Sequence, residues 1–74
     1  MYLFSRMRSK IWGDEAHACD IEFVMSPLDG RVRYYAACRS TMQRFRLTEN
    51  NCEEVLNDMF YDYCIENAAW MGVS

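Results

Sequence analysis

His17 and Cys19 are the residues of this 74-residue chain whose types and spacing could support nucleophilic catalysis. A histidine that accepts the proton of a neighbouring thiol would generate a reactive thiolate. Residues two apart on a strand share one face of a sheet, so a contact between these side chains is conceivable. The sequence contains no third group to orient the histidine, no serine nucleophile motif and no glycine-rich phosphate loop. We therefore expect a protein that is not an enzyme.

The four cysteines are separated by long gaps, and none of them forms a C-x-x-C pair. Because there is only one histidine, a zinc site would need four widely spread ligands, and we expect neither a metal ion nor another cofactor. Cys19 and Cys38 lie opposite each other on two predicted strands. That position permits a cross-strand disulfide or two reduced thiols in the core, and a cytosolic protein favours reduced thiols.

Charge is distributed unevenly along the chain, whose net charge is −3. All eight basic residues lie between Arg6 and Arg46, whereas residues 47–74 carry six acids and no base. This polarity is the strongest global feature of the chain.

The acidic end contains a row of carboxylates on one predicted helix, NNCEEVLNDMFYDYCIEN, residues 50–67. Four acids follow one another at four-residue intervals, and each such pair of like charges costs about 0.2–0.5 kcal/mol in an isolated helix. Tyr61 and Ile65 fall on the same outward side, and apolar anchors within a charged rim are typical of protein interfaces. We predict a protein-binding face formed by Glu54, Asp58, Tyr61, Asp62, Ile65 and Glu66. Two alternatives stay open: a solvated helix whose later acids pair with bases of residues 6–10, or self-association.

Arginines interleaved with a tyrosine form a second candidate surface, on the outer face of the predicted sheet. Such a face suits phosphates and base edges, and its residues are Arg31, Arg33, Tyr35, Arg44 and Arg46. The R-V-R-Y and R-F-R strands resemble, in architecture, the three-stranded sheets of plant GCC-box domains and of phage integrase arm-binding domains. That resemblance implies contact with DNA. Asp20 and Glu22 lie on the same face, where they can neutralise Arg33 and its neighbours.

Strands, turns and two terminal segments must position these residues. Residues 17–25 and 31–39 alternate between apolar and polar, and S-P-L-D-G between them has turn chemistry. A four-residue loop at 27–30 makes every inward residue meet an inward residue, in the pairs Met25–Val32, Phe23–Tyr34, Ile21–Ala36 and Cys19–Cys38. Residues 42–47 form a third strand with Phe45 and Leu47 inward.

The final helix, residues 51–70, has an apolar face that should cover the inward face of the sheet. The residues of this face are Cys52, Val55, Leu56, Met59, Phe60, Tyr63 and Trp70. Asn50 with Glu53, or Asn51 with Glu54, could cap its start. Residues 2–12 place Leu3, Phe4, Met7 and Ile11 on one helical face, which favours a helix, with a strand as the rival. We predict one α+β domain, residues 1–74, with a three-stranded antiparallel sheet.

Double-stranded-RNA-binding domains have the same α-β-β-β-α order, but they need a basic start to the last helix. Here that start is T-E-N-N-C-E-E, so the function does not carry over.

These features predict a small acidic binding protein that docks on a basic, nucleic-acid-gripping surface of a larger protein or nucleoprotein complex and inhibits or regulates it. Small size, acidity and the lack of catalytic groups resemble, in type, phage-encoded inhibitors of host defence, including anti-CRISPR proteins. One alternative is a small nucleic-acid-binding regulator, and a second is an obligate homodimeric structural subunit.

A cytoplasmic protein without a membrane segment is expected. No run of residues approaches the length of a membrane span, about 18 apolar residues. The start, MYLFSRMRSKIW, has arginines inside its apolar part, which does not fit a signal peptide.

Overall fold

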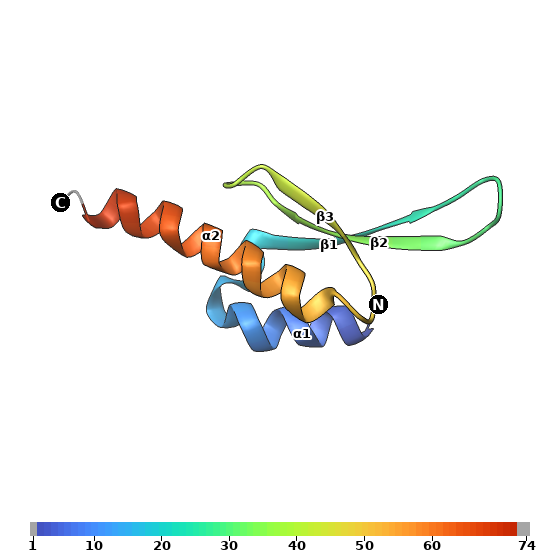
Figure 1. The fold of residues 1–74 in the computed structure, drawn as a ribbon, viewed down its shortest axis with the longest axis horizontal. Coiled ribbons are helices and arrows are strands. Elements are labelled where there is room, and N and C mark those ends of the chain that lie inside the picture. Colours follow the sequence, from blue (N-terminus) through green and yellow to red (C-terminus); the bar gives the residue numbers. More distant parts are fainter. Residues whose placement is uncertain (1, 73–74) are drawn as a thin grey trace.

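The computed structural model describes residues 2–72, with the side chains of residues 3–67. The three strands form an antiparallel sheet in the order β1-β2-β3, with a helix at each end of the chain (Figure 1). This confirms the predicted α+β fold. Its elements are α1 (Tyr2–Trp12), the 3-10 helix η1 (Gly13–Ala18), β1 (Cys19–Met25), β2 (Val32–Cys38), β3 (Gln43–Leu47) and α2 (Cys52–Gly72).

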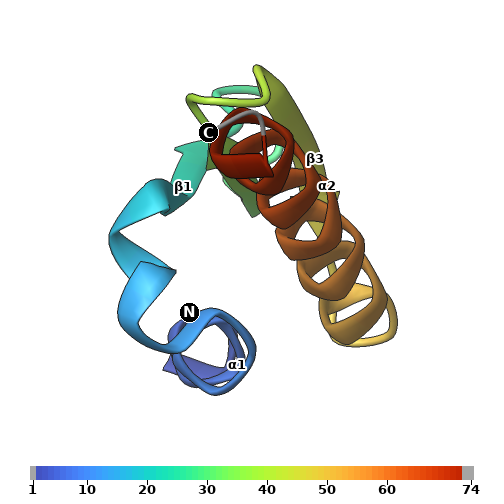
Figure 2. The ribbon, with the colours of Figure 1, turned by 90° about the vertical axis from the view of Figure 1, so that its left-hand side faces the viewer.

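Both α-helices lie on the same side of the sheet, and the core fills the space between them (Figure 1). Figure 2 shows η1 joining α1 to β1 along one side of the molecule, while α2 runs along the other. The enclosed side chains come from every element of the two layers except η1. They are Phe4, Trp12, Cys19, Ala36, Cys38, Leu47, Cys52, Leu56 and Met59.

Residues 2–12 form a helix, as the apolar spacing favoured, but the buried face is centred differently from the prediction. Phe4 and Trp12 are buried, whereas Leu3 is exposed. Trp12 lies eight residues after Phe4, a spacing that leaves the two side chains about 80° apart on one broad face of the helix. Its ring packs against Phe60 and Tyr63, and its indole nitrogen Nε1 donates to the Leu56 carbonyl oxygen at 3.2 Å. Trp12 therefore joins α1 to α2.

The first strand starts at Cys19, so the prediction of a strand from residue 17 is wrong at that end. Gly13 adopts φ +56°, a left-handed conformation that ends α1. The chain then makes η1, a helical turn that carries residues 14–17. His17 therefore lies on a helical turn and not on the face of a strand.

The hairpin of β1 and β2 has the predicted register, with Phe23 opposite Tyr34 and Cys19 opposite Cys38. Its four-residue loop closes through two backbone bonds between Ser26 and residues 30 and 31. The hairpin extends beyond both helices (Figure 1), so its far half has no covering layer. Three residues predicted to point inward, Phe23, Met25 and Val32, are consequently exposed, as is Phe45 on β3.

The start of α2 is capped by Thr48, which lies two residues before Asn50 and three before Asn51, the two predicted caps. The Thr48 backbone N–H donates to Asn51 Oδ1 at 2.7 Å, and the Asn51 N–H donates to Thr48 Oγ1 at 3.2 Å. Reciprocal bonds of this kind satisfy donors that a helix start leaves without partners. The predicted core face of the helix is confirmed from Cys52 to Tyr63. Trp70, placed on that face by its spacing, lies outside the described side chains.

The molecule is long and narrow, with principal extents of 51 × 21 × 18 Å. The hairpin projects at one end and the second half of α2 projects at the other (Figure 1). Within residues 2–72, neither helix has the length and apolar character needed to cross a membrane.

Candidate protein-binding surface

The six predicted residues of the protein-binding face form one continuous band along α2; we call this band the acidic face. It consists of Glu54, Asp58, Tyr61, Asp62, Ile65 and Glu66. At about 100° per residue, Tyr61 and Ile65 fall within about 40° of each other, directly opposite the buried side of the helix. The carboxylates border these two side chains and wind by about 40° per step toward the sheet side.

Tyr61 and Ile65 remain open to solvent, with exposed fractions of 66% and 49%. All four carboxylates are exposed as well. The ion pairs among the described side chains, residues 3–67, lie in the sheet and its hairpin, and none includes a carboxylate of the acidic face. Among the described side chains, no ion pair joins these acids to Arg8 or Lys10, so those two bases give no support to the alternative in which the later acids pair with residues 6–10. The negative charge of this band stays available to another molecule.

Asp62 is the carboxylate with a partner from the rest of the fold. Gln43 at the start of β3 donates from Nε2 to Asp62 Oδ2 at 2.7 Å. An amide donor does not neutralise the carboxylate, but it fixes the carboxylate's orientation. Glu66 lies one turn further along, in the second half of α2, and that half of the helix projects beyond the sheet (Figure 1). Around the helix, Glu66 points toward the side that carries the sheet. It is exposed because α2 projects beyond the sheet at this point.

A small apolar notch adjoins the acidic face. It has a volume of about 120 Å³ and is lined by Phe45 of β3 with Val55 and Asp58 of α2. Phe45 is half exposed there and had been assigned to the core from strand alternation alone. No sequence signal identifies this notch, because it depends on how closely α2 approaches β3. It adds an apolar recess beside a carboxylate, which suits a partner side chain with an apolar stem and a cationic end.

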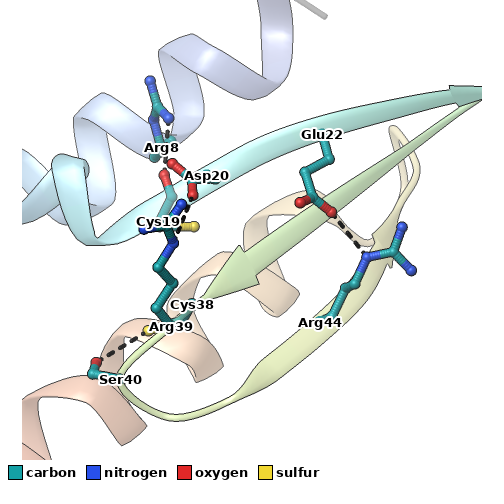
Figure 3. Close-up of polar contacts among 8 residues, drawn as sticks. All are labelled: Arg8, Cys19, Asp20, Glu22, Cys38, Arg39, Ser40 and Arg44. Atoms are coloured by element: carbon teal, nitrogen blue, oxygen red, sulfur yellow. Dashed lines mark hydrogen bonds and ion pairs between the residues drawn. The ribbon is translucent and has the colours of Figure 1, made fainter.

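The arginine surface on the outer sheet face is partly neutralised by the protein's own acids. Arg44 Nε lies 2.9 Å from Glu22 Oε1, and Arg39 Nε lies 3.9 Å from Asp20 Oδ2 (Figure 3). Arg44 also covers the ring of Tyr35, with Cζ 3.9 Å from the ring centroid. A base therefore cannot stack on that face of Tyr35 unless Arg44 moves.

The other arginines of this surface lie closer to the hairpin loop and to β3. Arg33 Nη2 is 3.9 Å from Asp29 Oδ2, and the Arg31 backbone N–H donates to Asp29 Oδ1. That backbone bond lowers the pKa of Asp29, so Asp29 stays ionised opposite Arg33. Arg31 and Arg46 are exposed beside them. The structure thus brings the five predicted residues to one sheet face, but with acids among them.

His17 and Cys19 do not form a reactive pair. Cys19 is fully buried, whereas His17 is exposed and its Nδ1 lies 3.2 Å from the Asp14 carbonyl oxygen. Burial raises the pKa of the Cys19 thiol to about 11, so the thiol is protonated at neutral pH.

A polar cavity of about 380 Å³ opens beside His17, and its wall includes Asp20, Arg39, Ser40 and Tyr63. The Tyr63 hydroxyl donates to Glu15 Oε2 at 2.8 Å, which raises the pKa of Tyr63 above its usual value. Among the described side chains, no three His, Cys, Asp or Glu residues are grouped so that they could hold a metal ion.

Comparisons of the chain with protein-family models, with curated proteins and with solved structures found no match. A functional assignment therefore has to be argued from the geometry of the acidic face.

Proposed function

We propose that this protein is a small binding protein that docks the acidic face of α2 on a basic surface of a larger protein and blocks that surface. The observation that supports it best is the exposure of Tyr61 and Ile65 beside four carboxylates that form no ion pair with the described side chains. An apolar centre within a charged rim provides both the desolvated anchor and the charge complementarity of a protein interface.

A surface that grips nucleic acid is the partner that fits this face. Such a surface carries lysines and arginines spaced for phosphates, and four carboxylates on one helix can occupy the same cations. The mechanism would be steric and electrostatic competition, without any chemical step. In this respect the protein would resemble small phage-encoded inhibitors of host defence. Its role would be to inhibit or regulate the partner protein.

The test is a pull-down from host lysate with the wild type and with Asp58→Lys/Asp62→Lys in parallel. Because both positions are exposed, the charge reversal should leave the fold intact while it removes binding. A matched control, Asp14→Lys/Glu53→Lys, makes the same change in charge at exposed positions outside the acidic face. We expect the partner to be captured by the wild type and by the control only.

The captured protein then serves as the probe for the mechanism. Duplex DNA or RNA added to the purified complex should release it, and binding should weaken as salt concentration rises. A complex that survives both treatments, or that forms equally well with Asp58→Lys/Asp62→Lys, would contradict the proposal.

The alternative, nucleic-acid binding by the outer sheet face, is supported by the exposed Arg31 and Arg46. A gel shift at low salt separates the two functions. Retardation of DNA by the wild type that disappears in Arg33→Glu would favour the sheet face and overturn the first proposal.

A further inference from the structure

The two edges of the sheet are protected to different degrees. On β3, arginines 44 and 46 stand at the edge, and Asn51 Nδ2 donates to the Arg46 carbonyl oxygen at 3.1 Å. Charged side chains and an added donor are common means of preventing further strand pairing. Along residues 21–25 the edge of β1 has no added donor, and its one charged side chain, Glu22, is paired with Arg44 across the sheet face. In the described part of the chain, β1 pairs with β2 along one edge, and no strand lies along the other edge of β1.

Register shows which backbone groups of β1 point to that open edge. Residues facing each other in an antiparallel ladder alternate between hydrogen-bonded and non-hydrogen-bonded pairs. Ser26 donates to the Arg31 carbonyl oxygen at 2.8 Å, so the even-numbered residues of β1 bond to β2. The N–H and C=O groups of Ile21, Phe23 and Met25 therefore point outward.

The start of β1 supports this assignment. Cys19 has the same parity as these residues, and its carbonyl oxygen accepts a bond from Arg8 Nη1 at 2.9 Å on the side away from β2. Its N–H is also used, because it donates to the Ala16 carbonyl oxygen. The edge is thus closed at Cys19 and open from Ile21 to Met25.

The same residues expose apolar side chains on both faces of the strand. Phe23 and Met25 are each 62% exposed, and Val24 on the opposite face is 48% exposed. A strand with an open edge and exposed apolar side chains is a strong template for pairing with another strand.

We propose that β1 pairs with β1 of a second copy of this chain, antiparallel about a two-fold axis at Phe23, to form a six-stranded sheet. Phe23 then faces Phe23 of the other copy, and Ile21 faces Met25. An antiparallel strand is complementary to itself about a two-fold axis, so one surface serves both copies.

The ends of the paired segment fit this register. Cys19 of one copy falls opposite Pro27 of the other. Proline has no N–H to donate, and both backbone groups of Cys19 already have partners. The pairing therefore leaves neither the N–H nor the C=O group of Cys19 without a partner. A shift of the axis to Val24 would instead place Pro27 opposite Ile21, whose carbonyl oxygen would then lack a donor.

Charge favours the same register. Glu22 of one copy lies opposite Val24 of the other, in the row that continues to Arg33, and Asp20 lies opposite Ser26, in the row that continues to Arg31. The acidic start of each β1 thus lies two strands, about 10 Å, from the basic start of the partner's β2. An axis at Glu22 would oppose two glutamates directly, which destabilises cross-strand pairs.

Light scattering and hydrogen exchange on the full chain test this interface. The wild type at submillimolar concentration should have twice the 8.8 kDa mass of one chain. The amides of Ile21, Phe23 and Met25 should exchange slowly in the dimer and rapidly on dilution, whereas those of Glu22 and Val24 should be slow in both states. A monomer at that concentration, or a dimer with rapid exchange at these three amides, would overturn the proposal.

Two substitutions locate the interface. Phe23→Lys places a charge on the open edge and should yield a monomer with an unchanged circular dichroism spectrum. Leu28→Lys makes the same replacement of an apolar residue by lysine at the hairpin tip, where Leu28 is 97% exposed, and should remain a dimer. If Phe23→Lys fails to fold, Met25→Lys serves in its place. A dimer that persists in the edge variants would contradict pairing through β1, and none of these results depends on the function of the acidic face.

Discussion

At the scale of single residues, Cys19 shows how burial in this fold changes the acidity of a side chain. Its thiol is buried against the end of β2, opposite Cys38, and all four cysteines are free thiols. Burial raises the pKa of Cys19, a shift that the positive charge of Arg8 partly opposes. At Cys38 burial acts in the same direction, but hydrogen bonds with Ser40 and Thr41 outweigh it, so the pKa of Cys38 is lowered. The two facing thiols therefore differ in acidity.

We predict that Cys19 makes the protein less stable in alkaline solution. Below its ordinary pKa of 9.0 the thiol is protonated in both the folded and the unfolded chain. Between pH 9 and about 11 the unfolded chain loses this proton while the folded chain keeps it. The free energy of unfolding should therefore fall over that interval, by at most about 3 kcal/mol.

Urea unfolding at pH 8 and pH 10.5, under reducing conditions, measures this loss in the wild type and in Cys19→Ala. The variant should lose less stability between the two pH values, because the alkaline titration of every other group is common to both proteins. Equal losses would show that the buried thiol does not contribute.

At the scale of secondary-structure elements, Asn51 joins β3 to α2. Its side chain accepts from the Thr48 N–H and donates to the Arg46 carbonyl oxygen, and its own N–H donates to Thr48 Oγ1. One residue thereby closes the edge of β3 and caps the helix that carries the acidic face. The direction of α2 away from the sheet depends on this short connection.

We predict that Asn51→Ala lowers the free energy of unfolding by about 1–2 kcal/mol, since loss of a helix cap typically costs that much. Asn50→Ala is the matched control: Asn50 is exposed and adjacent, and its replacement should change stability by less than about 0.5 kcal/mol. Chemical denaturation followed by circular dichroism compares the two variants. A similar effect of both substitutions would contradict the role assigned to the cap.

Local patterns were sufficient to predict most elements of the fold. Alternation and the S-P-L-D-G turn predicted the hairpin and its register correctly, because those properties depend on neighbouring residues. The position of the cap and η1 were missed, since several side chains in T-E-N-N could cap a helix and G-D-E-A-H-A has no distinctive periodicity. Burial of Phe23 and Met25 was predicted wrongly because it depends on how far the helices extend along the hairpin.

At the scale of the whole molecule, the two candidate surfaces lie on separate parts of an elongated structure. The acidic face belongs to α2, and the open edge of β1 belongs to the hairpin that projects at the other end (Figure 1). A row of acids is visible in the sequence as a spacing, so its residues could be predicted. Their lack of ion pairs with described side chains, the notch at Phe45 and the open edge of β1 are consequences of assembly, which the sequence does not show.

The charge polarity of the chain leads to a last prediction, that the protein becomes more stable as salt concentration rises. The four acids of the acidic face form three consecutive pairs of carboxylates at four-residue spacing. The two charges of each pair repel each other, and the total cost is roughly 1 kcal/mol at low ionic strength. Salt screens this repulsion because the carboxylates are exposed. The ion pairs of the sheet act in the opposite direction, but exposed pairs of that kind contribute little.

Replacing the four acids by their amides, Glu54→Gln/Asp58→Asn/Asp62→Asn/Glu66→Gln, should stabilise the protein at low salt and abolish most of the increase with salt. The matched control neutralises Asp20 and Glu22, which have arginine partners, and should leave that increase in place or enlarge it. Urea midpoints over a series of sodium chloride concentrations give the comparison. If the amide variant is no more stable than the wild type at low salt, the acidic face carries no electrostatic cost. The presence of four acids on this face would then give no support to a binding role.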